Sequence, residues 1–119
     1  MSGAIVDILR EDIEGVDVLT LDGEVDLTNA DVLQEAVEAT TAPAVVLDLT
    51  RLAYLDSSGI RAIDRGNRLL AAEQRQLLIV SPPHTAADWT FRVAGLSDDM
   101  RRGSLDAALA AALASAHRR

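Results

Sequence analysis

The sequence contains neither cysteine nor lysine, and all 11 of its basic residues are arginine. The absence of cysteine excludes disulfides, thiolate metal ligands and thiol nucleophiles. The absence of lysine excludes the phosphate-binding lysine of a P-loop and Schiff-base chemistry. Catalysis that depends on a thiol or a lysine amine is therefore excluded. The fold must be stabilised by a hydrophobic core without disulfides.

Aromatic residues are scarce, at 3 % of the chain, although hydrophobic residues make up 49 % of it. The 119 residues are expected to form a single domain, residues 1–119, with a core of Val, Leu, Ile and Ala. No apolar run approaches the ~20 residues of a membrane-spanning helix, and the N-terminus lacks a basic and apolar signal segment. We therefore expect a cytoplasmic protein without a membrane span.

The formal net charge is −8. Direct nucleic-acid binding needs clustered cations to neutralise phosphates, and only Arg101-Arg102 and Arg118-Arg119 form adjacent pairs. An acidic surface is better suited to a basic protein partner. We therefore expect no direct contact with nucleic acid.

Short branched-aliphatic segments alternate with amphipathic ones along the chain. The pattern predicts strands at 4–10, 16–21, 44–49 and 76–80, an edge strand at 98–102, and helices at about 30–40, 58–73, 85–94 and from 104 onward. Residues 11–15 should form a turn, Thr28-Asn29 should cap the first helix, and Ser104 the last. This order predicts an α/β fold, with a mixed β-sheet of four to five strands covered by about four α-helices.

The most informative segment is 45–60, where an apolar strand stops at Asp56-Ser57-Ser58-Gly59. Asp and Ser favour N-caps because their oxygens accept from the free backbone N–H groups of the first helical turn, and glycine permits close packing. The segment therefore predicts a buried strand that delivers a serine pair to a helix. A phosphate would also be accommodated at such a helix start.

A serine hydrolase is the enzymatic interpretation of Ser57, and the rest of the sequence does not support it. Only His84 and His117 could act as the base, and neither lies near a Gly-x-Ser-x-Gly elbow. Both are better explained as solvated surface residues. We expect neither an enzyme nor a bound cofactor or metal.

A second cluster consists of Asp22, Glu24 and Asp26, at the end of the second predicted strand. Three carboxylates could hold a hard cation or perform acid–base work. Because no glycine-centred calcium loop accompanies them, a solvated acidic loop is the simpler interpretation. Trp89 and Phe91, on the predicted helix at 85–94, are interpreted as packing residues.

Four segments together resemble the STAS domain family. These are Leu21-Asp22-Gly23-Glu24-Val25-Asp26, Leu55-Asp56-Ser57-Ser58-Gly59-Ile60, Ser81-Pro82 and Phe91-Arg92-Val93-Ala94-Gly95-Leu96. They occur in the family's order and span nearly the whole chain. The resemblance implies a compact α/β fold, and the single-domain bacterial members of the family are anti-sigma factor antagonists.

The resemblance also implies roles for individual residues. Ser57 matches the family's phosphoacceptor, beside Asp56, which would tune the local field, and Ser58, which would cap the helix. The segment that holds Asp22, Glu24 and Asp26 would border this turn and contribute to the partner-docking face. The expected partner-binding residues are Glu24, Asp26, Asp56, Ser58, Gly59 and Arg61, although the charge of Arg61 departs from the small residue usual at its position.

The implied function is a regulatory switch. The chain would bind an anti-sigma factor with serine kinase activity and so release a sigma factor, phosphorylation of Ser57 would end the binding, and a serine phosphatase would reset it. The alternative is a STAS module of a scaffold or transport complex, or a nucleotide-sensing domain, without reversible phosphorylation. Ser57→Ala and Ser57→Asp should have opposite effects on binding only if the switch interpretation is correct.

Overall fold

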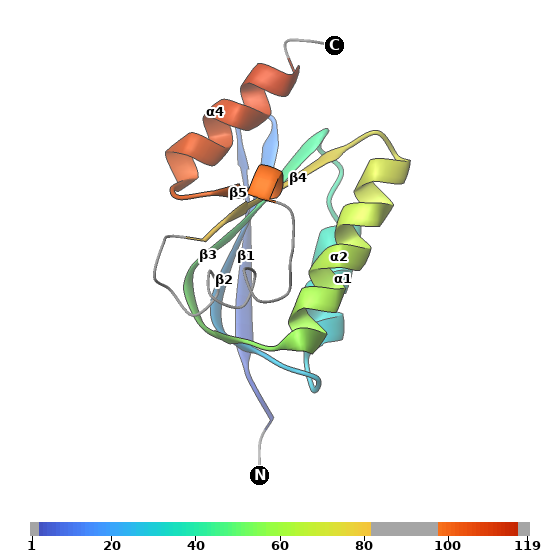
Figure 1. Cartoon of the computed structure of the whole chain (residues 1–119), viewed down its shortest axis with the longest axis vertical. Helices are drawn as coiled ribbons and strands as arrows, with labels where there is room; N and C mark the ends of the chain where they lie inside the picture. Colours follow the sequence, from blue (N-terminus) through green and yellow to red (C-terminus); the bar gives the residue numbers. More distant parts are fainter. Residues whose placement is uncertain (1–2, 82–97, 117–119) are drawn as a thin grey trace.

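The computed structural model describes residues 3–81 and 98–116. Five strands form one mixed sheet in the order β1-β2-β3-β4-β5 (Figure 1). The strands are β1 Val6–Ile13, β2 Val16–Val25, β3 Ala44–Leu55, β4 Gln76–Val80 and β5 Arg101–Arg102. β1 pairs antiparallel with β2, and the other neighbours pair in parallel. The predicted α/β fold with a mixed sheet is confirmed.

The described part of the chain also contains three α-helices: α1 Ala30–Glu38, α2 Ser57–Ala72 and α4 Leu105–Ala116. The predicted edge strand at 98–102 is a 3-10 turn, Asp98–Met100, followed by the two-residue strand β5. The helix predicted at 85–94 lies outside the described residues, together with His84, Trp89 and Phe91. His117 and Arg118-Arg119 also lie outside them.

The hairpin between β1 and β2 is tighter than the sequence suggested. Glu14 and Gly15 both have positive φ, 53° and 83°, which is the backbone of a two-residue hairpin turn of type I′. Because two residues suffice, Glu11 and Asp12 remain in β1 as exposed edge-strand residues rather than in a turn. The turn is held by the Gly15 N–H, which donates to Asp12 Oδ1 at 2.9 Å.

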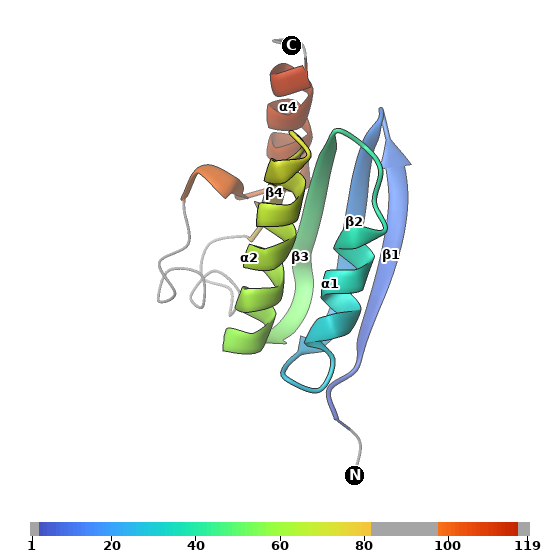
Figure 2. The same cartoon turned by 90° about the vertical axis from the view of Figure 1, so that its right-hand side faces the viewer.

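The sheet is covered on both faces. Leu19, Leu47 and Ile79 point to the face where α1 and α2 pack, and Val18, Val46 and Leu78 belong to the cluster under α4. Figure 1 shows α1 and α2 on one side of the sheet and α4 on the other, and in Figure 2 α1 and α2 lie in front of the strands. Because β2 and β3 lie inside the sheet, both of their faces are apolar over much of their length.

β2 and β3 are longer than predicted, and this extension positions the candidate site. β3 was expected to end at Leu49, but it continues through Leu55 and pairs with a β2 that ends at Val25. Beyond Asp48, β3 no longer pairs with β4. The two strands therefore project together past the shorter β4 and carry the starts of α1 and α2.

None of the helices in residues 3–81 and 98–116 is long and apolar enough to cross a membrane.

Candidate regulatory surface

Asp56 forms the N-cap of α2. Its Oδ1 accepts from the N–H groups of Ser58 at 2.9 Å and Gly59 at 3.2 Å, and its backbone is extended. The prediction that Ser58 caps the helix is therefore wrong. The carboxylate two residues earlier takes that N–H, so the helix begins at Ser57 and Ser58 lies within its first turn.

Ser57 is the first residue of α2 and is exposed. The residue is therefore accessible to solvent beyond the carboxyl end of β3. Neighbouring Ser58 is half-buried and faces α1 instead. Of the serine pair, Ser57 is thus the more accessible to another protein.

Gly59 is buried and allows α2 to start directly against the strand ends. A Cβ at this position would lie 2.2 Å from Leu55 Cδ1 and 3.0 Å from Val25 Cγ1, which is closer than packed carbon atoms approach. Gly59 was predicted to bind a partner. Its burial indicates that any such contribution is indirect, through the position of the helix.

Asn29 holds the connection between β2 and α1 together. Its Nδ2 donates to the carbonyls of Ala4 at 3.0 Å and Glu24 at 2.9 Å, and its Oδ1 accepts from the N–H of Asp26. Although Asn29 occupies the N-cap position of α1, its side chain makes no capping hydrogen bond. The predicted position of the cap is therefore confirmed, but the side-chain capping bond is absent, because this amide instead ties the N-terminal segment to the end of β2.

The carboxylate cluster does not converge on one point. Asp22 lies 3.8 Å from the Arg51 guanidinium, and Asp26 Oδ1 accepts from the N–H and the hydroxyl of Thr28. Glu24 is exposed. Within residues 3–81 and 98–116, no group of three His, Cys, Asp or Glu side chains is arranged to hold a metal ion.

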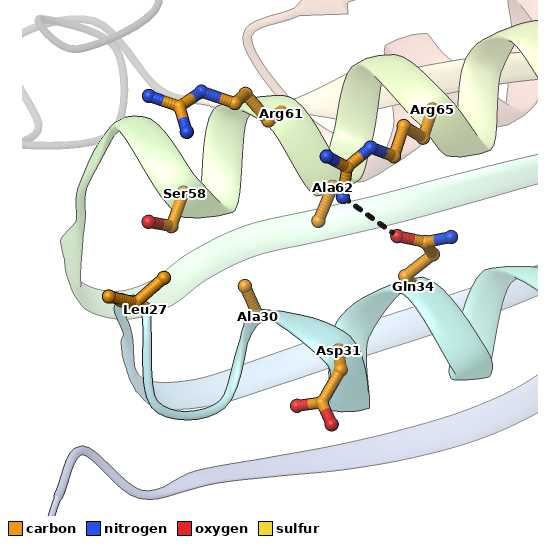
Figure 3. Close-up of a pocket in the computed structure, with 8 residues that line it drawn as sticks. All are labelled: Leu27, Ala30, Asp31, Gln34, Ser58, Arg61, Ala62 and Arg65. Atoms are coloured by element: carbon orange, nitrogen blue, oxygen red, sulfur yellow. Dashed lines mark hydrogen bonds between the residues drawn. The ribbon is translucent and has the colours of Figure 1, made fainter.

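A cleft of about 220 Å³ opens between the first turns of α1 and α2 (Figure 3). It is lined by Leu27, Ala30, Asp31, Gln34, Ser58, Arg61, Ala62 and Arg65. Arg65 reaches across it, and its Nη1 donates to Gln34 Oε1 at 3.4 Å. Leu27, at the mouth of the cleft, is 79 % exposed, more than any other large hydrophobic side chain in the described part of the chain.

The surface around the cleft includes most of the predicted partner-binding residues. Ser58 and Arg61 line it, and Ser57 and Asp56 lie at the start of the same helix. Glu24 lies near the end of β2, and Asp26 belongs to the connection that carries Leu27. Sequence reasoning missed Leu27 and Arg65. We call the surface formed by Leu27, Ser57, Ser58, Arg61 and Arg65 the α1–α2 surface.

The sequence-family model of the STAS domain matches residues 7–116, and the chain therefore belongs to the STAS domain family. The crystal structure of an anti-sigma factor antagonist from Mycobacterium paratuberculosis is similar, with a TM-score of 0.78 and 28 % identity over 91 % of this chain and 94 % of that one.

Two further solved structures show the fold alone. The Bacillus cell fate determinant SpoIIAA in its phosphorylated form has a TM-score of 0.67 at 18 % identity, over 87 % of this chain and 96 % of that one. A sulfate transporter family protein from Wolinella succinogenes has a TM-score of 0.67 at 20 % identity, over 82 % and 84 % of the two chains. A search of curated proteins gave no significant match.

Proposed function

We propose that this chain is an anti-sigma factor antagonist, which binds an anti-sigma factor through the α1–α2 surface and is released when Ser57 is phosphorylated. The observation that carries the proposal is the exposure of Ser57 at the first position of α2, next to a cleft and an exposed leucine. The likeness to the mycobacterial antagonist, over nearly the full length of both chains, supports the same class.

This surface suits a switch because phosphorylation replaces a neutral hydroxyl with a doubly charged phosphate. The kinase activity of the anti-sigma factor transfers the γ-phosphoryl group of ATP to Ser57 Oγ, ADP leaves, and the hydroxyl proton is lost. The product carries roughly −2 charge where a neutral hydroxyl stood. A contact shaped for a hydroxyl would have to desolvate this charge without a counter-ion, which costs several kcal/mol, or on the order of a hundredfold or more in affinity.

The rest of the cycle belongs to the partners. ATP and its metal ion are bound by the kinase, and a serine phosphatase hydrolyses the phosphoserine to restore binding. The net charge of −8 favours a basic docking surface on the anti-sigma factor. The cycle operates in the cytoplasm, where sigma factors act.

The test combines phosphorylation with binding. The chain is incubated with ATP, Mg²⁺ and the anti-sigma factor captured from native cells, and the phosphate is located by peptide mass spectrometry. One phosphate is expected on Ser57. Ser57→Ala should remain bound to the kinase in the presence of ATP, and Ser57→Asp should fold normally but bind at least tenfold more weakly.

Ser104→Asp is the matched control. Ser104 precedes α4 on the opposite face of the sheet, where its hydroxyl accepts from the Ala107 N–H at 3.2 Å, and Asp is an equally good N-cap. This variant adds the same charge at another helix start and should bind as wild type does. If Ser57→Asp also binds as wild type does, the chain is a STAS module without a phosphorylation switch.

A further inference from the structure

Two N–H groups in the first turn of α2, those of Ser58 and Gly59, are not free to receive a phosphate. Asp56 Oδ1 already accepts from the N–H groups of Ser58 and Gly59. The sequence led us to expect that a phosphate on Ser57 would be stabilised by this helix end. Since the Asp56 carboxylate occupies it, the phosphate would instead meet a neighbouring negative charge, and its dianion needs a cation from elsewhere.

Arg61 is placed to supply that cation. It lies four residues after Ser57 on α2, and side chains at this spacing are neighbours on a helix surface, with Cβ atoms about 5–6 Å apart. Arg61 is exposed and makes no hydrogen bond or ion pair with any residue in 3–81 or 98–116. In Figure 3 its guanidinium extends from the turn above Ser58.

Three other charged groups near this turn are engaged or directed elsewhere. Arg65 donates to Gln34, and the Asp31 carboxylate of α1 points away from Arg61 (Figure 3). Asp26, in the β2–α1 connection, accepts from Thr28. Among the residues that line the cleft, no carboxylate is therefore directed at the Arg61 guanidinium, where it would compete with a phosphate.

Resting on the proposed function, we infer that Arg61 is the intramolecular counter-ion of phosphorylated Ser57. In the unphosphorylated chain no residue in 3–81 or 98–116 pairs with its guanidinium, which leaves it open to a partner on that side. In the phosphorylated chain the phosphate binds it, because a guanidinium donates two parallel hydrogen bonds to a phosphate. Phosphorylation thus adds a negative charge to the docking surface and withdraws a positive one, while α2 keeps its start.

The test uses full-length chain in which phosphoserine is installed at position 57 by genetic encoding, so that no kinase is needed. The ³¹P chemical shift is followed against pH at low salt. Arg61→Gln should raise the phosphate pKa by about 0.3, from the strength of an exposed helical ion pair at this spacing. The difference should shrink in 1 M salt, where screening acts within about 3 Å.

Arg68→Gln is the matched control. It removes the same charge from the same helix, but Arg68 pairs with Asp64 at 3.0 Å and lies 11 residues beyond Ser57. This variant should leave the phosphate pKa unchanged. An equal phosphate pKa in wild type and Arg61→Gln, or a rise only in Arg65→Gln, overturns the inference. If the kinase does not phosphorylate Ser57, the proposed function is contradicted. The ³¹P result is unaffected by that outcome, because the phosphoserine is installed by genetic encoding.

Discussion

Arg10 of β1 and Asp17 of β2 form an ion pair in which the carboxylate is buried and the guanidinium is largely exposed, with 3.1 Å between Nη1 and Oδ1. The second carboxylate oxygen accepts from the N–H groups of Thr41 and Ala42, both at 3.0 Å. Burial raises the pKa of Asp17, but the Ala42 and Thr41 N–H donors and the Arg10 guanidinium together hold it below its ordinary value. Asp17 therefore fixes the α1–β3 connection in its ionised form.

The first prediction concerns Asp17→Asn. At pH 7 this variant should lose about 2 kcal/mol of the free energy of unfolding, because one amide cannot accept all three hydrogen bonds. Folding lowers the pKa of Asp17. The ionised carboxylate therefore stabilises the protein fully at pH values above its ordinary pKa of 3.8, and this stabilisation is lost as the pH falls through the folded-state pKa. Urea unfolding from pH 7 to pH 2.5 should show the gap to wild type narrowing.

Glu11→Gln is the control for charge alone, because Glu11 is exposed on β1. It should differ from wild type by less than about 0.5 kcal/mol at every pH. A gap for Asp17→Asn that stays constant down to pH 2.5 would show that its ionisation does not stabilise the fold.

The second prediction concerns Gly59→Ala. The new Cβ would overlap Leu55 Cδ1 at 2.2 Å, so the variant should lose about 1–3 kcal/mol of stability, although alanine normally favours a helix over glycine. Thermal unfolding measures the loss. In a Leu55→Ala background the same substitution should cost less, because the overlapping methyl is gone. Additive losses would place the strain elsewhere.

The third prediction separates the cap of α2 from its charge. Asp56→Ala removes the acceptor for the N–H groups of Ser58 and Gly59 and should cost about 1 kcal/mol. Asp56→Asn keeps an acceptor oxygen and should stay within a few tenths of wild type. Denaturant midpoints of the two variants give the comparison. Equal losses for both would mean that the carboxylate charge, and not the cap, holds this helix start.

The sequence was sufficient to predict the order of the described elements and, to within one residue, the start of α2. Apolar residues on both faces indicated that β2 lies inside the sheet, and Asp56-Ser57-Ser58-Gly59 indicated where a strand gives way to a helix. Both features are local patterns. They depend on side-chain periodicity and on capping, which a few neighbouring residues determine.

The extension of β3 and the role of Asn29 could not be predicted in this way. Buried and exposed side chains do not alternate strictly along residues 50–55. The reason is that the pairing with β2 shifts register between Thr20 and Asp22 and again between Gly23 and Glu24. Asn29 bonds to the carbonyl of Ala4, which is 25 residues away. Similarly, Leu27 and Arg65 share a cleft only because α1 packs beside α2.

The last prediction concerns Leu27, the exposed leucine at the mouth of the cleft. Leu27→Ser should leave the thermal midpoint nearly unchanged, because the side chain is 79 % exposed and supports no packing in the free protein. If the proposed partner covers the α1–α2 surface, the same substitution should weaken binding about tenfold or more, since a leucine that becomes buried on binding contributes roughly 1.5–3 kcal/mol. Titration calorimetry with the anti-sigma factor measures the affinity. Leu9→Ser is the matched control, because Leu9 is 58 % exposed on β1, away from the cleft. It should bind as wild type does, and equal weakening by the two variants would show that the partner does not dock at the cleft.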